Sequence, residues 1–257
     1  MSIFARSPAD RVIVVGAGVA GLATALRLAP RPVTLITAAP LGAGTATGWA
    51  QGGIAAAVAA DDAPSLHADD TCAAGAGLTE REVALRVAEA GPGLIDWLVA
   101  LGTGFDREAN GSLALGLEAA HSRRRIVRAR GDSTGRTVLD ALVCAAQATP
   151  SIEILVAGLH GLMRDADGRV RGVVCERDGV AFRLPARAVV LATGGVGALY
   201  ASTTNPRGAL GRGLLAAAWP VRPCAIWNSC SSTRPPSRPV AIPCRSRPRP
   251  SGARVRG

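Results

Sequence analysis

A short apolar run directly before three spaced glycines constrains the fold more than any other feature of the sequence. The run Val12–Val15 holds four β-branched residues with no polar alternation, which is typical of a strand covered on both faces of a parallel sheet. Gly16, Gly18 and Gly21 follow, and apolar residues then recur at roughly helical spacing. A strand, a glycine turn and a helix in this order predict a dinucleotide-binding site.

Each of the three glycines has its own expected role in that turn. Gly16 permits a tight turn, Gly18 lets the backbone approach a pyrophosphate, and Gly21 lets the helix pack close to the strand. The pyrophosphate would lie against the free N–H groups and the positive dipole end of the helix. The predicted cofactor-binding residues of the turn are Gly16, Ala17, Gly18, Val19, Ala20 and Gly21.

The residues that follow the next predicted strand argue against NAD as the dinucleotide. Residues 32–37 indicate a second strand, and an acidic residue that binds the ribose of NAD is expected near its end. Thr37, Ala38 and Ala39 stand there, and the first acidic residue beyond them is Asp61. The sequence therefore favours a dinucleotide whose ribose is held in another way.

Later segments extend the predicted sheet. Residues 152–156 and 188–192 indicate two more strands, and residues 162–174 indicate a hairpin around Asp167-Gly168. The strand at 188–192 ends at Thr193-Gly194-Gly195, and ligands of open α/β sheets bind at such carboxyl ends. We expect a Rossmann-like, doubly wound α/β domain with helices on both faces, an incomplete sheet and a small β-hairpin excursion near 162–184.

Two helices are expected between residues 79 and 102. Thr79 with Glu82 forms a capping box that opens the first helix, and Gly91-Pro92-Gly93 predicts its end. Leu94–Leu101 then form the second helix, with Gly102 as its C-cap.

Two polar segments remain open to interpretation. Residues 42–60 are rich in glycine and alanine, and Gly52-Gly53 lets the backbone approach a flat or bulky group. Residues 118–126 gather an acid, a histidine, a hydroxyl and three arginines. They indicate either a solvated turn or a segment that binds carboxylates, because the arginine fork matches carboxylate geometry.

The net charge of +10 belongs mostly to the end of the chain. Residues 220–257 hold eight arginines and no acid, which leaves 21 basic and 19 acidic groups in residues 1–219. The body of the chain therefore gives little reason to expect nucleic-acid binding. No apolar stretch has the length of a membrane span or a signal peptide, and no cysteine–histidine cluster has metal-ligand spacing. We expect a cytoplasmic protein without a metal.

With these segments identified, residues 11–219 resemble the L-aspartate oxidases, in the flavoprotein group that includes succinate dehydrogenase and fumarate reductase. The motifs that carry the resemblance occur in the order of that family: VVGAGVAGL, TATGWAQGGIAA, HADDTCAAGAGL, GLEAAHSRRRI, GDSTGR, VLATGGVGALY and TTNP. The dehydrogenases carry a covalent flavin on a histidine where this chain has Ala46, so the resemblance implies non-covalent FAD.

The resemblance also implies an activity and a set of site residues. L-aspartate is oxidised to iminoaspartate, an early step of NAD biosynthesis, and dioxygen or fumarate accepts the electrons. Glu118 matches a glutamate near the substrate, whereas His121 is expected to be structural or to support the residues that contact the substrate. Further cofactor-binding residues implied by the resemblance are Thr47, Ala50, Gln51, Gly52, Gly53, Thr193, Gly194 and Gly195. Gly211-Arg212-Gly213 departs from the family, which has an aspartate where this chain has Arg212.

The resemblance stops at Pro220. When residues 220–256 are back-translated and read from the third base of each codon, they can encode a sequence that contains LEFVQFHPTAL and TEALRG, the segments expected next. We therefore hypothesise an incomplete FAD-binding domain at 1–219 and a disordered, out-of-frame tail at 220–257, in a truncated and inactive chain. The alternatives are another FAD- or NAD-dependent oxidoreductase, fumarate reductase-like for example, or a non-enzymatic fragment with a basic tail.

Overall fold

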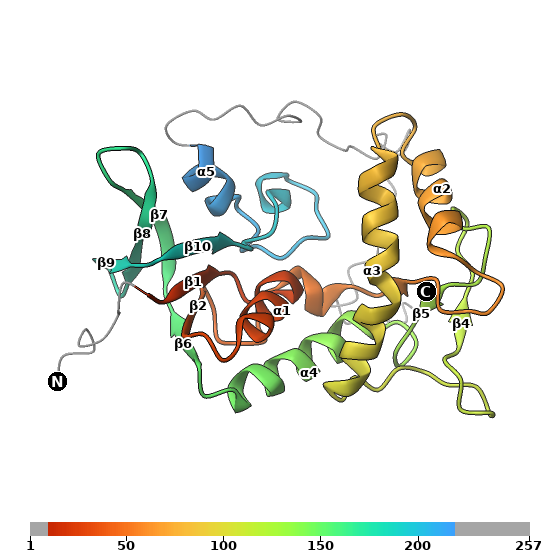
Figure 1. Ribbon diagram of the computed structural model, residues 1–257. Coiled ribbons are helices and arrows are strands. Elements are labelled where there is room, and N and C mark those ends of the chain that lie inside the picture. The colour runs from red at the N-terminus through yellow and green to blue at the C-terminus, as the bar shows by residue number, and fades with distance from the viewer. Residues whose placement is uncertain (1–9, 219–257) are drawn as a thin grey trace, which may run out of the picture. The chain divides into compact units, whose positions relative to one another are not determined.

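The computed structural model describes residues 10–218, and its central feature is a four-stranded parallel sheet (Figure 1). The strand order is β10-β1-β2-β6, and all three pairings are parallel. The four strands are β1 (Val12–Val15), β2 (Val33–Thr37), β6 (Ile152–Val156) and β10 (Ala188–Leu191). Every residue of β1 and β2 is buried, as the prediction of strands covered on both faces requires.

Two strands from distant parts of the sequence pair in this sheet, the inner strand β1 and the edge strand β10. β1 pairs with β10 over its whole length, from Val12 opposite Ala188 to Val15 opposite Leu191. Because the strands run in the same direction, the glycines that follow each of them lie at the same edge of the sheet. The sequence predicted that β1 and β10 end at the same edge of one sheet. Their parallel pairing is confirmed.

Two helices cover one face of the parallel sheet. α1 (Val19–Leu28) follows the glycine turn, and α4 (Thr134–Ala148) packs beside it. Their buried side chains join alternate residues of the strands in the largest hydrophobic cluster, which includes Val12, Val14, Leu22, Ala25, Val33, Leu35, Leu139 and Leu142. α4 begins four residues before the predicted Val138, at the segment DSTGR.

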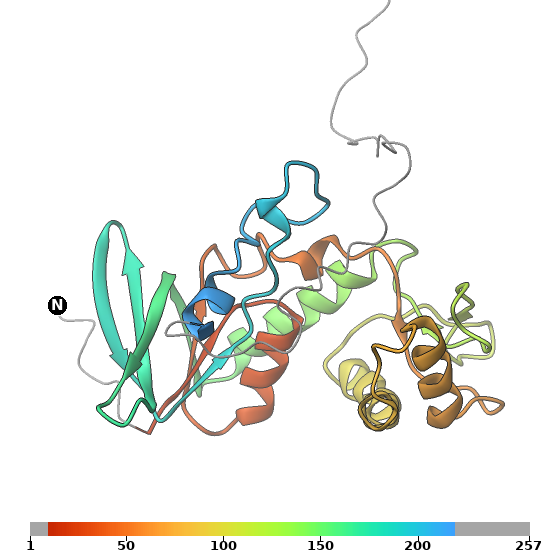
Figure 2. The same cartoon turned by 90° about the horizontal axis from the view of Figure 1, so that it is seen from above.

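The opposite face carries a helix, as predicted, and in addition a second sheet. The predicted hairpin is confirmed as β7 (Gly158–Arg164) and β8 (Val170–Arg177), and β9 (Val180–Pro185) adds a third antiparallel strand. One side of this sheet is apolar and packs on the parallel strands together with α5 (Arg212–Ala218), through Ile13, Val15, Ile36, Leu159, Val173, Cys175 and Ala216. The second sheet and α5 lie on the same side of the parallel sheet (Figure 2), and their apolar side chains cover that face.

The helical pair differs from the prediction in its boundaries. α2 (Pro64–Ala74) precedes α3 (Arg81–Ala100), which runs through Pro92 without ending. Packing on both sides of the proline outweighs the lost hydrogen bond, because Ala88 and Ile95 are both buried. Gly91 adds a close contact, since a Cβ atom there would lie 3.4 Å from the Cβ of Ala56.

The predicted capping box at the start of α3 is also wrong. Glu80 occupies the N-cap, and no side chain caps the helix. Thr79 instead packs so tightly against Gly75 that a Cβ atom at that glycine would overlap the threonine side chain. The tight turn between α2 and α3 uses Thr79 for packing and leaves it unavailable as a cap.

Short elements complete the described part of the chain. β3 (Ile54–Ala55), β5 (Ile126–Val127) and β4 (Leu115–Gly116) form a small antiparallel sheet in that order. Two 3₁₀ turns, η1 (Ala46–Trp49) and η2 (Gly197–Leu199), lie in the segments after β2 and β10. Within residues 10–218 no helix has the length and apolar character to cross a bilayer. The predicted tail lies outside the described residues.

Candidate functional site

The turn between β1 and α1 accepts only glycine at two of its positions. Gly16 has a φ of +109°, and a Cβ atom there would overlap the carbonyl oxygen of Ala192, just after β10. A Cβ atom at Gly21 would overlap the carbonyl oxygen of Gly16. β1, β10 and α1 therefore meet as closely as bare backbone allows, in the arrangement predicted for Gly16 and Gly21.

The N-terminus of α1 is exposed and carries no negative charge. Gly18 is the N-cap residue, Val19 and Ala20 are exposed, and no acidic side chain occupies the first turn. The N–H of Val19 donates a hydrogen bond of 3.0 Å to Oγ1 of Thr47. A helix end with this exposure and charge is suited to an anion such as a pyrophosphate.

The loop after β2 is anchored by the start of α4. The N–H of Gly135 donates to the carbonyl oxygen of Ala50 over 3.0 Å, and a Cβ atom at Gly135 would overlap the Thr47 carbonyl oxygen. Gly135 lies in the motif GDSTGR but was not among the predicted site residues. Farther along the loop, a Cβ atom at Gly53 would overlap the carbonyl oxygen of Val127, so Gly53 packs against β5.

The segment after β10 contacts the start of α5. The N–H of Gly211 donates to the carbonyl oxygen of Gly195 over 3.0 Å, and a Cβ atom at Gly213 would overlap Oγ1 of Thr193. Between these glycines, Arg212 extends toward β7, where a Cβ atom at Gly158 would lie 3.3 Å from its Nη1. The arginine that replaces the family's aspartate thus has a packing role against the second sheet.

Three glycines of the candidate site border open space. A Cβ atom at Gly52, Gly194 or Gly195 would have no atom within 4 Å among the described residues beyond its immediate chain neighbours, and all three residues are exposed. Only Gly194, with φ of +73°, needs glycine for its backbone conformation. Bare backbone facing open space beside an anion-binding helix end fits a flat dinucleotide such as FAD, which needs close backbone approach.

Glu118 forms an ion pair at the edge of the small antiparallel sheet. Nη2 of Arg128 lies 3.1 Å from Oε1 of Glu118, and the two side chains are 41% and 47% exposed. Arg128 follows β5, and its Cγ lies 3.0 Å from where a Cβ atom at Gly53 would stand. The predicted substrate residue is therefore joined to the predicted cofactor loop through Arg128, which the sequence analysis did not single out.

Arg125 lies at the centre of a buried charge network in the segment 118–126. Its guanidinium group binds both carboxylate oxygens of Asp62 at 2.8 and 2.9 Å and one oxygen of Asp70 at 2.8 Å. The side chains of Arg125 and Asp62 are completely buried. Arg123 and Arg124 are exposed, so the solvated-turn interpretation holds for these two, and Arg125 binds carboxylates of the chain itself.

The pKa of the Asp70 carboxyl is lowered by its partners in this network. Burial alone would raise that pKa, but the hydrogen bonds from the N–H and hydroxyl groups of Ser122 and the charge of Arg125 outweigh it. Since the folded-state pKa is depressed, the stabilisation is present above the unfolded-state value and is lost as pH falls through the folded one.

His121 packs against the network and against a second histidine. Its ring centroid lies 5.5 Å from that of His67 in an edge-on arrangement, and its Nδ1 is 3.5 Å from Nη1 of Arg125. Burial, followed by the charge of Arg125, lowers the pKa of His67. These contacts agree with the expected structural role of His121.

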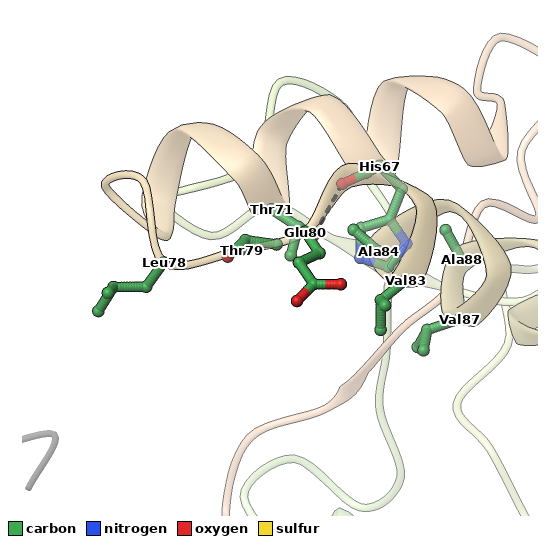
Figure 3. Close-up of a pocket in the computed structure, with 9 residues that line it drawn as sticks. All are labelled: His67, Thr71, Leu78, Thr79, Glu80, Val83, Ala84, Val87 and Ala88. Carbon is green, nitrogen blue, oxygen red and sulfur yellow. Dashed lines mark hydrogen bonds between the residues drawn. The ribbon is translucent and has the colours of Figure 1, made fainter. Parts of the chain in front are cut away.

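His67 also lines a groove between α2 and α3 (Figure 3). The groove has a volume of about 400 Å³, and its lining is mostly apolar: His67, Thr71, Leu78, Thr79, Glu80, Val83, Ala84, Val87 and Ala88. None of these residues is predicted to bind the cofactor. The groove therefore shares no lining residue with the candidate site at the edge of the parallel sheet.

Comparisons with protein families and curated proteins give one consistent result. A family described as an FAD binding domain matches residues 11–222. L-aspartate oxidase of Mesorhizobium japonicum is 50% identical over 206 residues, which cover 80% of this chain and 40% of that protein. L-aspartate oxidase of Agrobacterium fabrum is 46% identical over 209 residues, with coverage of 81% and 40%. The chain thus spans about 40% of the length of these relatives.

Two solved structures share this fold over most of the chain. A quinol fumarate reductase variant of E. coli is 30% identical, with a TM-score of 0.77 over 82% of this chain and 37% of that one. The Sdh1 complex of Mycobacterium smegmatis is 27% identical, with a TM-score of 0.76 over 82% and 38%.

Proposed function

Because the chain belongs to the family of FAD binding domains, we propose that it is the cofactor-binding part of an enzyme that oxidises L-aspartate to iminoaspartate. The observation that carries the proposal is the edge where β1 and β10 end, with bare glycine backbone around an exposed, uncharged helix N-terminus. Identities of 46–50% to L-aspartate oxidases support the choice of substrate.

The proposed FAD site draws on three segments of the chain. In this proposal the glycine turn and the N-terminus of α1 hold the pyrophosphate, and the Thr47 hydroxyl fixes the helix end. The loop at 50–53 and the segment 193–195 lie against the rest of the cofactor. Ala46 offers no side chain that could bond to the flavin, so the proposed binding is non-covalent.

The chemistry of the proposed reaction belongs to the cofactor. Bound FAD supplies a two-electron acceptor that can take a hydride from a substrate carbon. The Glu118 carboxylate, held by Arg128, provides negative charge that attracts the ammonium group of an amino acid. Fumarate or dioxygen is the proposed final electron acceptor, and the likeness to a fumarate reductase supports the former.

Two further parts of the proposal concern location and organisation. The free thiols of Cys72, Cys144 and Cys175 support a cytoplasmic location, because reduced cysteines persist there. We assign residues 1–219 to the FAD-binding domain and residues 220–257 to an out-of-frame tail. The tail's eight arginines, eight prolines and lack of acidic residues support this assignment.

The frame assignment predicts a specific result at the nucleotide level. Sequencing across the codons for Trp219 and Pro220 should reveal an open frame that continues in the shifted register past codon 257. That register should encode LEFVQFHPTAL shortly after the junction between Trp219 and Pro220. Stop codons in the shifted register close to the junction would contradict the assignment.

FAD binding by the 257-residue chain tests the proposed function directly. We expect the purified chain to bind FAD, seen as quenching of flavin fluorescence during titration. Thr47→Ala should weaken binding roughly two- to tenfold, because one hydrogen bond to the helix end is lost. Thr71→Ala is the matched control, since its exposed hydroxyl binds only its own helix at His67. Equal FAD affinity in both variants would show that Thr47 does not contribute to FAD binding. A wild-type chain that does not bind FAD would contradict the proposed function.

A further inference from the structure

Arg128 touches both the predicted cofactor loop and the predicted substrate residue. A Cβ atom at Gly53 would lie 3.0 Å from its Cγ, and one at Gly116 would lie 3.3 Å from its Cζ and Nε. These two glycines leave the space that the arginine occupies. The stem thus packs against Gly53, just before β3, and the guanidinium packs against Gly116 of β4.

The guanidinium group directs its hydrogen bonding to Glu118. Nη2 lies 3.1 Å from Oε1 of Glu118, while Nε is buried without a hydrogen-bond partner among the described residues. Packing therefore holds the stem of Arg128, while 41% of its side chain remains exposed. The carboxylate of Glu118, by contrast, extends from an exposed turn that begins after β4.

We propose that Arg128 is a positioning residue that fixes the Glu118 carboxylate relative to the Gly53 loop, so that the site distinguishes an amino dicarboxylate from the same dicarboxylate without its amino group. This inference rests on the proposed function. Without Arg128, Glu118 would sample several rotamers, and its charge would spread over a larger volume. The attraction for an ammonium group at one place would then fall.

Hydrogen exchange on the whole chain tests the positioning step without any ligand. The N–H of His121 donates to the Glu118 carbonyl oxygen over 3.0 Å and reports on the order of the turn. Arg128→Gln should speed exchange at this amide roughly two- to fivefold, the range available from a half-exposed ion pair. Arg124→Gln, an exposed arginine in the same turn, should leave it unchanged. Equal exchange in the two variants overturns the proposal.

The preference for L-aspartate over succinate tests whether Arg128 affects ligand binding as well as the order of the turn. In the FAD-loaded chain, the affinity ratio of L-aspartate to succinate is measured by perturbation of the flavin absorbance. Arg128→Gln and Glu118→Gln should both lower this ratio, and Arg128→Lys should restore part of it because the charge returns. An unchanged ratio in Arg128→Gln beside a collapsed ratio in Glu118→Gln overturns the positioning role. If neither dicarboxylate perturbs the wild-type flavin, the proposed substrate fails, while the exchange result still decides whether Arg128 holds Glu118.

Discussion

A chain that carries Gly21→Ala is expected to lose most of its folding stability and all of its FAD binding. The added methyl group would overlap the carbonyl oxygen of Gly16, which is backbone and cannot rotate away. α1 would have to move off β1, and the cost should exceed the roughly 1–3 kcal/mol of ordinary overpacking. Against a total stability of about 5–15 kcal/mol, this loss is a large fraction of the free energy of unfolding.

Gly93→Ala provides the matched control for that variant. Gly93 lies inside α3, and a Cβ atom there would meet no other atom within 4 Å. This substitution should stabilise the chain by about 0.5–1 kcal/mol, because alanine favours the helix more than glycine does. Urea unfolding followed by circular dichroism measures both variants. A midpoint for Gly21→Ala equal to that of the wild type would contradict the close packing of α1 on β1.

Arg125→Met is the second substitution with a large expected effect. It removes the cation from the buried network and leaves the Asp62 carboxylate without its partner, although that side chain has no exposed surface. Breaking a buried ion pair by removing one member costs about 3–5 kcal/mol, since the remaining charge stays desolvated. Chemical denaturation should show this loss as a lower midpoint at an unchanged slope.

A double variant distinguishes the effect of an unpaired buried charge from the effect of lost packing around Arg125 and Asp62. Asp62→Leu combined with Arg125→Met removes the two fully buried charges, and it should recover much of the lost stability. The remaining carboxylate, Asp70, is 18% exposed and keeps its hydrogen bonds from Ser122. Arg124→Met serves as the control, since that arginine is exposed in the same turn. If Arg125→Met alone matches Arg124→Met, the network contributes nothing to stability.

The central strands and the glycine turn were predictable because their signals are local. Val12–Val15 is apolar throughout, and the glycines follow it at fixed spacing, so a window of ten residues contains the whole pattern. The boundaries of α3 were not predictable in this way. Pro92 and its flanking glycines read as a helix end, yet the helix continues and packs at Gly91 against Ala56, which lies outside that window.

The same distinction applies to the candidate site. The glycines near the ends of β1 and β10 were found, whereas Gly135 and Arg128 were missed, because their importance comes from contacts with distant residues. Arg125 binds carboxylates that are 55 and 63 positions away in the sequence. Composition placed it among solvated arginines, and no short-range pattern shows which of three neighbouring arginines turns inward.

The pairing of β1 with β10 also sets the order of events on the ribosome. The glycine turn emerges among the first residues, but Ala192, whose carbonyl oxygen closes one side of that turn, is synthesised only after nearly all of the described chain. Such long-range pairing forms late, because the intervening chain must be ordered first. The nascent protein therefore carries an open, unfinished turn through most of its translation, and cofactor capture must wait until β10 has left the exit tunnel.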